Sequence, residues 1–492
     1  MKISQEVRSA PGGAAARSGR PVVWYAIRVA VTFVFAATIN AVDLGVAGDS
    51  IEADEWFIGQ LNGQPAVSLH QSALRLGRGG RTTTADMVMV FKRKLDRQES
   101  RFEVRQSQRQ IEDADGKLVS FRLDEEQNGA PVSAVGAISG GRVRGVLHRL
   151  GRADEFDLVI PEGLPVVADR RGLELMGAAE GQPGEVVRFA TVGLVANQVL
   201  VMVNTATAQG READGASRFQ VAIEHVPGPM TVVVNRRGVL RRMALDLGAI
   251  KLELTPSAGP VALLGAELAT TGLVAIAGPS PRPAPINRYL LPEGATVSED
   301  GFQHRDGDIL TVRKNAEPEP LADPAAWLAA GPQLEIDDPG LRQWGTDLVS
   351  GAQTDPLERA EHLCLAVRSY ITIKDLSVND GSALETWRSR RGDCTEHATL
   401  LCAVLRIAGL PARVDVGLVF YAEFGGWVGH AWNSVWIGDR WHHLDSALPN
   451  TARSLYIRLG SPTGTVLGST GAALMSNLST VMGKRITVLA PE

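Results

Sequence analysis

The chain has 492 residues, of which 44% are hydrophobic and 21% are charged, and its formal net charge is -5 at pH 7. This length exceeds that of one ordinary domain and predicts two or three. The composition is that of a globular protein. The mildly negative charge argues against a nucleic-acid-binding protein, which usually carries an excess of lysine and arginine.

The first 48 residues have the pattern of an export signal. Basic residues precede an apolar run at 22–42, and small residues follow it. The uninterrupted part of the run, 29–42, is shorter than the roughly 20 residues of a membrane-spanning helix. We therefore expect residues 1–48 to be a signal peptide, with an uncleaved signal anchor in the membrane as the alternative. Either pattern predicts export to the periplasm or the extracellular space.

Residues 50–255 are rich in short apolar runs separated by glycine-containing turns, as in "MVMVFKRKL" at 87–95. This pattern is typical of an antiparallel sheet. Two segments, "DADGKLVSFRLD" from Asp113 and "NRRGVLRRMALD" from Asn235, share a turn residue followed by glycine three positions later. Each predicts a hairpin. We interpret the region as a structural β-rich domain, which is either one unit or two related units.

Residues 256–338 are rich in proline and glycine and predict a linker with short strands. A helical region begins near residue 339. Its segment "TDPLERAEHLCLAVRSYI" starts with Asp355 as N-cap and Pro356 in the first turn. We assign a catalytic domain to 339–455 and a C-terminal extension to 456–492.

The chain has three cysteines, Cys364, Cys394 and Cys402. Cys364 lies on the apolar face of the helix that starts at Pro356, which predicts an ordinary core residue. Cys394 and Cys402 would lie about 12 Å apart on one helix, too far for a disulfide. An odd number of thiols in an exported protein indicates that at least one is reactive or unpaired.

Cys394 lies in the stretch "RRGDCTEHATLLCAVLRIAGLPAR", where the pattern predicts a helix from Asp393 or Cys394 to Ala408. The cysteine is therefore on the first helical turn, where the helix dipole and free backbone N–H groups favour a thiolate. Those N–H groups could also stabilise an oxyanion beside the sulfur. Cys402 falls on the apolar face in mid-helix, which predicts inert core.

A hairpin further along brings an acid to a histidine. "HAWNSVWI", starting at His430, is followed by the two-residue turn Gly438-Asp439 and by "RWHHLDSAL". With that turn Ile437 faces Arg440, which makes Asp445 a diagonal neighbour of His430 on one face. A carboxylate there can hold the imidazole in one tautomer.

The stretches "GDCTEHA" and "HAWNSVWIGDRWHHLD" together resemble the transglutaminase-like superfamily, in its bacterial cysteine peptidase or amidase form. The resemblance covers about 340–450. It implies an α+β fold with a papain-like core, in which a helix bearing the nucleophile Cys394 packs against an antiparallel sheet bearing the base His430 and the third member Asp445. Members often have Asp-Pro-Thr where this chain has Asp-Ser-Ala from Asp445 on.

Other residues near these motifs have simpler interpretations. His397 shares a helix face with Cys394, and we expect it to pack within the helix layer. His442 and His443 with Cys394 would suggest zinc, but no pair has typical zinc-ligand spacing, so we expect no metal and no cofactor. Trp387 is a sequence neighbour to consider as an oxyanion donor, although a core role is the simpler interpretation.

The expected chemistry is acyl transfer from a protein or peptide amide through a thioester on Cys394. For bacterial members of the family, the resemblance implies hydrolysis more often than cross-linking. The alternative is a non-catalytic module that binds protein or cell wall in the same cleft. The expected partner is a protein or peptide substrate and no nucleic acid. The sequence does not determine the substrate or the oligomeric state.

Overall fold

The computed structural model describes residues 49–490, apart from internal stretches at 78, 96–97, 128–129, 150–151, 196–197, 225–228, 247–250, 268–273, 332, 351–353, 375–380, 423–424, 449–450, 463–469 and 479. The predicted export signal, residues 1–48, lies outside the described residues. Within the described part of the chain, no helix combines the length and apolar character needed to cross a membrane.

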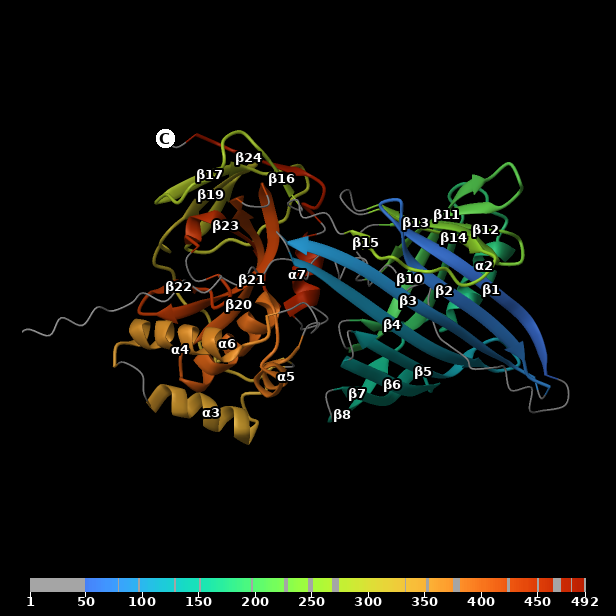
Figure 1. The fold of residues 1–492 in the computed structure, drawn as a ribbon, viewed down its shortest axis with the longest axis horizontal. Coiled ribbons are helices and arrows are strands. Elements are labelled where there is room, and N and C mark those ends of the chain that lie inside the picture. Colours follow the sequence, from blue (N-terminus) through green and yellow to red (C-terminus); the bar gives the residue numbers. More distant parts are fainter. Residues whose placement is uncertain are drawn as a thin grey trace, which may run out of the picture.

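The chain forms two bodies that lie side by side, each built around its own sheet (Figure 1). The first sheet is an antiparallel meander that runs from β1 to β8, continues through α2, and returns from β9 to β14, where β14 pairs with β1. Its elements are β1 (Ser50–Leu61), β2 (Gln64–Arg75), β3 (Arg81–Leu95), β4 (Gln98–Glu112), β5 (Leu118–Gln127), β6 (Ala130–Ser139), β7 (Arg142–Arg149), β8 (Arg152–Val159), α2 (Asp169–Ala178), β9 (Val186–Val195), β10 (Gln198–Arg211), β11 (Ser217–Ile223), β12 (Met230–Val234), β13 (Leu240–Asp246), β14 (Lys251–Ser257) and β15 (Ala266–Glu267).

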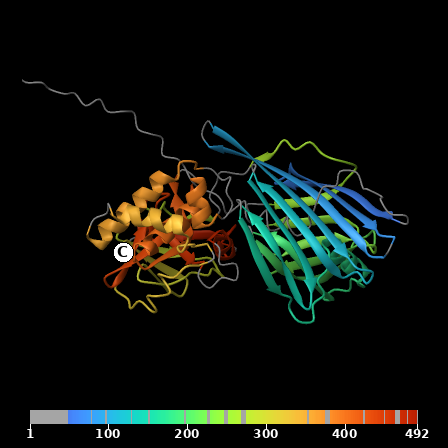
Figure 2. The same ribbon diagram turned by 90° about the horizontal axis from the view of Figure 1, so that it is seen from below.

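The first sheet curves around an apolar core. Alternate side chains of β3, including Met87 and Met89, point inward with Phe189 and Phe219 from the returning half, and Met176 of α2 packs among them. Figure 2 shows the two halves as facing layers. This alternation is what a sheet with one buried face requires.

The two predicted hairpin turns have the same conformation. Asp113 accepts backbone N–H bonds with its side chain at 2.9 and 3.0 Å, and Asn235 does the same at 2.9 and 3.0 Å. The glycines three positions later, Gly116 and Gly238, both have positive φ, of 77° and 74°. The turns are thus repeated, but the strands around them belong to one continuous sheet rather than to two separate units.

The second body is α+β, as the sequence predicts. Its sheet has the order β18-β19-β17-β24-β16-β21-β20-β23, with β22 added to β21, and α3, α4 and α6 form a layer against it (Figure 2). Its elements are β16 (Val274–Ala277), β17 (Ile286–Leu290), β18 (Gln303–Asp306), β19 (Ile309–Arg313), α3 (Pro339–Ser350), α4 (Pro356–Tyr370), α5 (Ala383–Ser389), α6 (Cys394–Ile407), β20 (Ala412–Tyr421), β21 (Gly426–Ile437), β22 (Arg440–Leu444), the 3-10 turn η2 (Arg453–Leu455), β23 (Tyr456–Gly460), α7 (Thr470–Leu478) and β24 (Arg485–Val488).

The stretches predicted as a linker with short strands and as a C-terminal extension both contribute strands to the second sheet. Short strands do occur in 256–338, but β16 and β17 pair with β24, and β16 also pairs with β21. Asp300 from the same stretch accepts ion pairs from the buried Arg413 and Arg458. The proline and glycine content marks irregular connections between strands, and the strands themselves complete the sheet.

The two bodies also meet outside their connecting segment. Arg149, at the end of β7, lies 3.4 Å from the Glu385 carboxylate of α5. Figure 1 shows α7 on the side of the second body that faces the first sheet.

We predict that a fragment of 320–492 will not fold stably, whereas a fragment of 274–492 will. The shorter fragment lacks β16 to β19 and with them the buried Tyr289, Phe302 and Leu310. Each such side chain contributes roughly 1.5–3 kcal/mol when buried, against a total stability of about 5–15 kcal/mol. Thermal unfolding followed by circular dichroism checks this. Equal cooperative transitions for both fragments would show that β16 to β19 are dispensable.

Candidate active site

The helix that carries Cys394 starts where the sequence predicts. Asp393 is the N-cap of α6: its side chain accepts the N–H of Thr395 at 2.9 Å, and its own N–H donates to Glu396 at 2.9 Å. Together they form a capping box. Gly392 precedes the cap because a Cβ there would lie 2.3 Å from the Cβ of Glu396. Cys394 is thus the first residue of the helix, as predicted.

The protonation state of Cys394 differs from the prediction. Its side chain is fully buried, and burial raises the pKa of the thiol well above its ordinary value, with the Asp393 carboxylate adding to the effect. The backbone N–H of Ala431 donates to the sulfur and opposes the rise in pKa. Burial and the Asp393 carboxylate therefore oppose the thiolate that a helix N-terminus alone would favour.

The hairpin of β21 and β22 has the predicted register. Ile437 pairs with Arg440 across the turn, and the pairing continues to Asn433 with Leu444 at the end of β22. Asp445 follows that last pair directly. The sequence alternation and the two-residue turn were sufficient to fix this register, because a slip by one residue would turn every buried side chain outward.

Asp445 and His430 are in direct contact. Oδ2 of Asp445 lies 2.7 Å from Nε2 of His430, and the two side chains are 2% and 1% exposed. Oδ1 of Asp445 accepts the backbone N–H groups of Ala447 and Leu448 at 2.8 and 2.7 Å. Burial would raise the pKa of Asp445, but His430 and these bonds outweigh it and hold the pKa at about 2. The carboxylate is therefore ionised at neutral pH.

An ionised carboxylate can only accept, so Nε2 of His430 carries the ring proton and Nδ1 presents its lone pair. Nδ1 is buried and has no hydrogen-bond partner among the residues that the structure describes. The sulfur of Cys394 receives its hydrogen bond from Ala431, the residue next to His430. The strand that carries His430 therefore lies against the thiol at the start of α6, and Asp445 lies against the imidazole.

A fourth side chain was missed by the sequence analysis. The hydroxyl of Tyr456, at the start of β23, donates to Oδ2 of Asp445 at 2.8 Å. No motif marks this tyrosine. The alternating run "LYIRLG" could have indicated a strand, but its pairing with β20 depends on the tertiary fold.

The other residues singled out in the sequence have structural roles. Nδ1 of His397 contacts Ser446 Oγ at 3.2 Å, and burial lowers the pKa of this histidine to about 3, which fits the predicted helix packing. His443 lies edge-on against Tyr456, with ring centroids 4.6 Å apart. Among the described residues, no group of three or more histidine, cysteine and acidic side chains could hold a metal ion.

The remaining cysteines lie in the core, and the half-buried Trp387 packs against it. Cys364 is 6% exposed, and burial raises its pKa to about 12. Cys402 is fully buried beside the backbone of Ala412. Trp387 packs against Gly340, where a Cβ would lie 2.8 Å from the indole ring. These positions agree with the structural interpretation of all three residues.

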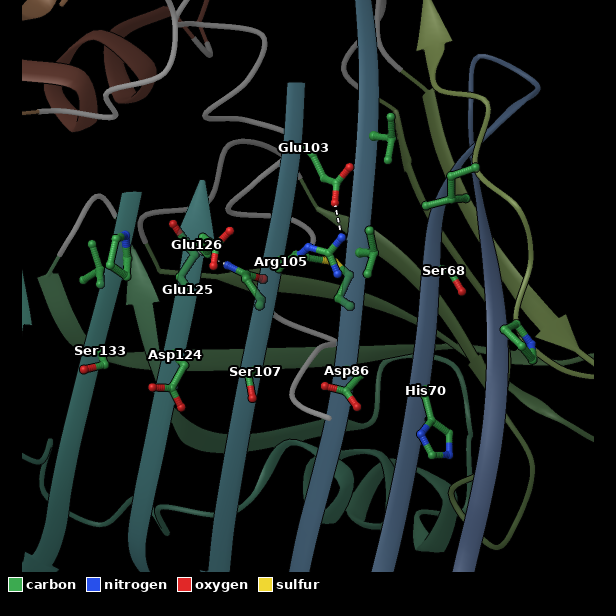
Figure 3. A pocket seen from close by; sticks show the side chains of 18 of the residues that line it. Ser68, His70, Asp86, Glu103, Arg105, Ser107, Asp124, Glu125, Glu126 and Ser133 are labelled. Atoms are coloured by element: carbon green, nitrogen blue, oxygen red, sulfur yellow. Dashed lines mark hydrogen bonds and ion pairs between the residues drawn. The ribbon is translucent and has the colours of Figure 1, made fainter. Parts of the chain in front are cut away.

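A concave surface lies on the first sheet, far along the chain from these residues. It is a groove of about 900 Å³ on one face of the sheet, bordered by the segment after β14. Figure 3 shows a polar row across it, in which directly paired residues succeed one another on neighbouring strands. The row consists of His70, Asp86, Ser107, Asp124 and Ser133.

Many charged groups in the groove are paired with one another. Glu103 contacts Arg101 and Arg105, and Arg122 lies 2.6 Å from Asp124. These ion pairs neutralise much of the local charge, and none of them places a base beside a nucleophile. The groove therefore lacks the arrangement that the start of α6 has.

Comparison with solved structures finds seven matching chains, and three of them, each at low identity, are as follows. A candidate cysteine protease from Cytophaga hutchinsonii is 13% identical, over 44% of this chain and 82% of that chain, with a TM-score of 0.28. A β-barrel-like protein of a domain of unknown function from Brucella abortus is 16% identical, over 42% and 98%, with a TM-score of 0.30. The periplasmic domain of TgpA from Pseudomonas aeruginosa is 18% identical, over 34% and 73%, with a TM-score of 0.23.

No curated protein matches the sequence. Residues 342–446, however, match the sequence model of the transglutaminase-like superfamily. This stretch contains Cys394, His430 and Asp445, the residues on which the resemblance was recognised. Over residues 342–446 this chain therefore resembles the transglutaminase-like superfamily.

Proposed function

We propose that this chain is a thiol-dependent acyl transferase, which acts on protein or peptide amides and passes the acyl group to water. The observation that carries the proposal is the state of His430. Its Nε2 is bonded to an ionised carboxylate, and its buried Nδ1 has no partner among the described residues beside a helix that begins with a cysteine. A neutral imidazole held in this way is a general base.

In the first step the sulfur of Cys394 attacks the carbonyl carbon of the amide, and the thiol proton passes to Nδ1 of His430. Because burial raises the pKa of the thiol, this transfer accompanies the attack. The imidazolium that forms is stabilised by Asp445. His430 then gives its proton to the leaving nitrogen, the C–N bond breaks, and a thioester remains on Cys394.

In the second step water attacks the thioester while Nδ1 of His430 takes its proton. The C–S bond breaks, the acid is released, and the proton returns to the sulfur. An amine in place of water would give cross-linking by the same sequence of transfers. We propose water as the acceptor on the ground of the family resemblance, and peptide bonds or glutamine side chains as the amide.

A non-catalytic binding module is the alternative. Such a module would need a cleft but not a base with a free nitrogen beside a thiol. The buried Asp445–His430 pair favours the catalytic proposal, because burying an ionised carboxylate is costly unless the fold compensates for it. The two functions differ in one measurable respect, since only the enzyme turns substrate over.

We expect Cys394→Ala and His430→Ala to abolish hydrolysis of a peptide amide, and Asp445→Asn to lower turnover by up to about 10⁴-fold. The asparagine would donate where the carboxylate accepts and so hold the ring in the wrong tautomer. Turnover of each variant on a fluorogenic peptide amide, with and without a chelator, is the measurement.

Two matched controls accompany this panel. Cys402→Ala removes a buried thiol from the same helix, and Asp439→Asn neutralises an exposed acid in the turn of the same hairpin. Both should retain turnover. Full activity of Asp445→Asn would remove Asp445 from the mechanism, loss of activity with chelator would indicate a metal, and ligand binding without any turnover would support the binding module.

We predict that iodoacetamide alkylates Cys394 slowly at neutral pH, because the raised pKa leaves only a small fraction of the thiol as thiolate. Each further pH unit increases that fraction about tenfold, so the alkylation rate should increase about tenfold per unit above neutral pH. Mass mapping should still find Cys394 modified before Cys364 and Cys402, since only Cys394 has a free base nearby. A rate that is already constant below pH 7 would instead reveal a preformed thiolate–imidazolium pair, and equal rates at the three cysteines would refute the special position of Cys394.

We also propose export, on the pattern of residues 1–48. The mature protein from its host should begin near Asp49, as read by N-terminal sequencing. A full-length product in the membrane fraction would favour the signal anchor, and a full-length cytoplasmic product would contradict export.

A further inference from the structure

Two side chains form hydrogen bonds with the same oxygen of Asp445. Oδ2 faces Nε2 of His430 at 2.7 Å and accepts the hydroxyl of Tyr456 at 2.8 Å. Resting on the function proposed above, we propose that Tyr456 is a positioning residue of the catalytic site, which sets how strongly Asp445 draws the proton on His430.

The ring of Tyr456 is fixed in place. It is fully buried and lies edge-on to Trp432, with centroids 5.1 Å apart, and to His443, at 4.6 Å. On the backbone, Tyr456 pairs with Val419 of β20. A ring held on these sides cannot swing its hydroxyl away from the carboxylate without disturbing the packing.

The hydroxyl acts as a donor and not as an acid. Burial and the neighbouring Asp445 charge raise the pKa of Tyr456 well above its ordinary value, so it stays protonated at all working pH values. A neutral donor on Oδ2 spreads the negative charge that His430 would otherwise receive alone. Tyr456 thereby keeps the His430 ring from binding its proton too tightly to release it to the leaving group.

Tyr456 lies outside residues 342–446, which match the transglutaminase-like superfamily. It belongs to the last part of the chain, which closes the sheet beyond the shared core. This chain therefore supplies a site residue from a segment that the family match does not cover.

The chain offers a matched control in Tyr289. This tyrosine is also fully buried, and its hydroxyl donates to the backbone oxygen of Ser454 at 2.8 Å. Asn287 donates to the same oxygen at 3.0 Å, so Tyr289→Phe leaves that acceptor satisfied. Tyr289→Phe and Tyr456→Phe are thus the same chemical change in the same sheet, and only one of them touches Asp445.

The test compares wild type, Tyr456→Phe and Tyr289→Phe in the full chain. With the hydroxyl gone, Asp445 favours the protonated ring more strongly. The acid limb of the pH–rate profile should therefore move to higher pH by about half a unit, with turnover about tenfold lower. Tyr289→Phe should leave the limb in place. Difluorotyrosine at position 456 keeps the ring and is a stronger hydrogen-bond donor, so it should move the acid limb of the pH–rate profile to lower pH. This variant also keeps the proposal testable if Tyr456→Phe fails to fold.

A second readout does not depend on turnover. In ¹⁵N-histidine-labelled protein, the titration of the His430 ring, assigned by loss of its signal in His430→Gln, should shift in the same direction as the limb. If wild type shows no turnover yet the ring titration shifts, the proposed enzyme function fails and the role of Tyr456 stands. If neither the limb nor the ring titration differs between Tyr456→Phe and Tyr289→Phe, Tyr456 is only a packing residue.

Discussion

The carboxylate of Asp445 accepts hydrogen bonds from His430, Tyr456 and two backbone N–H groups, and the arrangement of the candidate site depends on it. An isolated carboxylate buried to this degree would cost several kcal/mol and would become protonated. Here the bonds and the neighbouring ring keep it ionised. An ionised Asp445 holds His430 in the tautomer with the proton on Nε2. This tautomer leaves the lone pair of Nδ1 available to accept a proton.

Cys394 shows two physical effects in competition. A helix N-terminus stabilises an anion by about 0.3–1 kcal/mol at the surface and by up to about 2 kcal/mol in partly buried sites. Removing a charge from water costs several kcal/mol even after the protein relaxes. Burial therefore outweighs the dipole, and the adjacent Asp393 adds to its effect. Burial thus disfavours the thiolate, and in the proposed mechanism His430 takes the proton at the moment of reaction.

The sheet around the site is assembled from distant parts of the chain. Asp300, from the proline-rich stretch before the helices, lies among the buried Arg413 and Arg458, and Asp415 accepts from Arg458 at 2.6 Å. A buried network of this kind is stable only when all its members are present. The candidate site is therefore supported by strands on both sides of the residues that match the family, and its sheet draws on elements from β16 to β24.

The sequence by itself determined the local features of the site. The capping residues placed Cys394 at the start of a helix, and the two-residue turn placed Asp445 beside His430, because capping and hairpin register depend on neighbours within a few residues. Only the tertiary structure decided the rest. The raised pKa of the thiol follows mainly from burial. The hydroxyl of Tyr456 reaches Asp445 from a strand paired with β20, and strands of 256–338 join the second sheet through β24. Burial, the pairing of β23 with β20 and the pairing of β24 with β16 and β17 depend on how separate elements assemble, which turn and capping patterns do not specify.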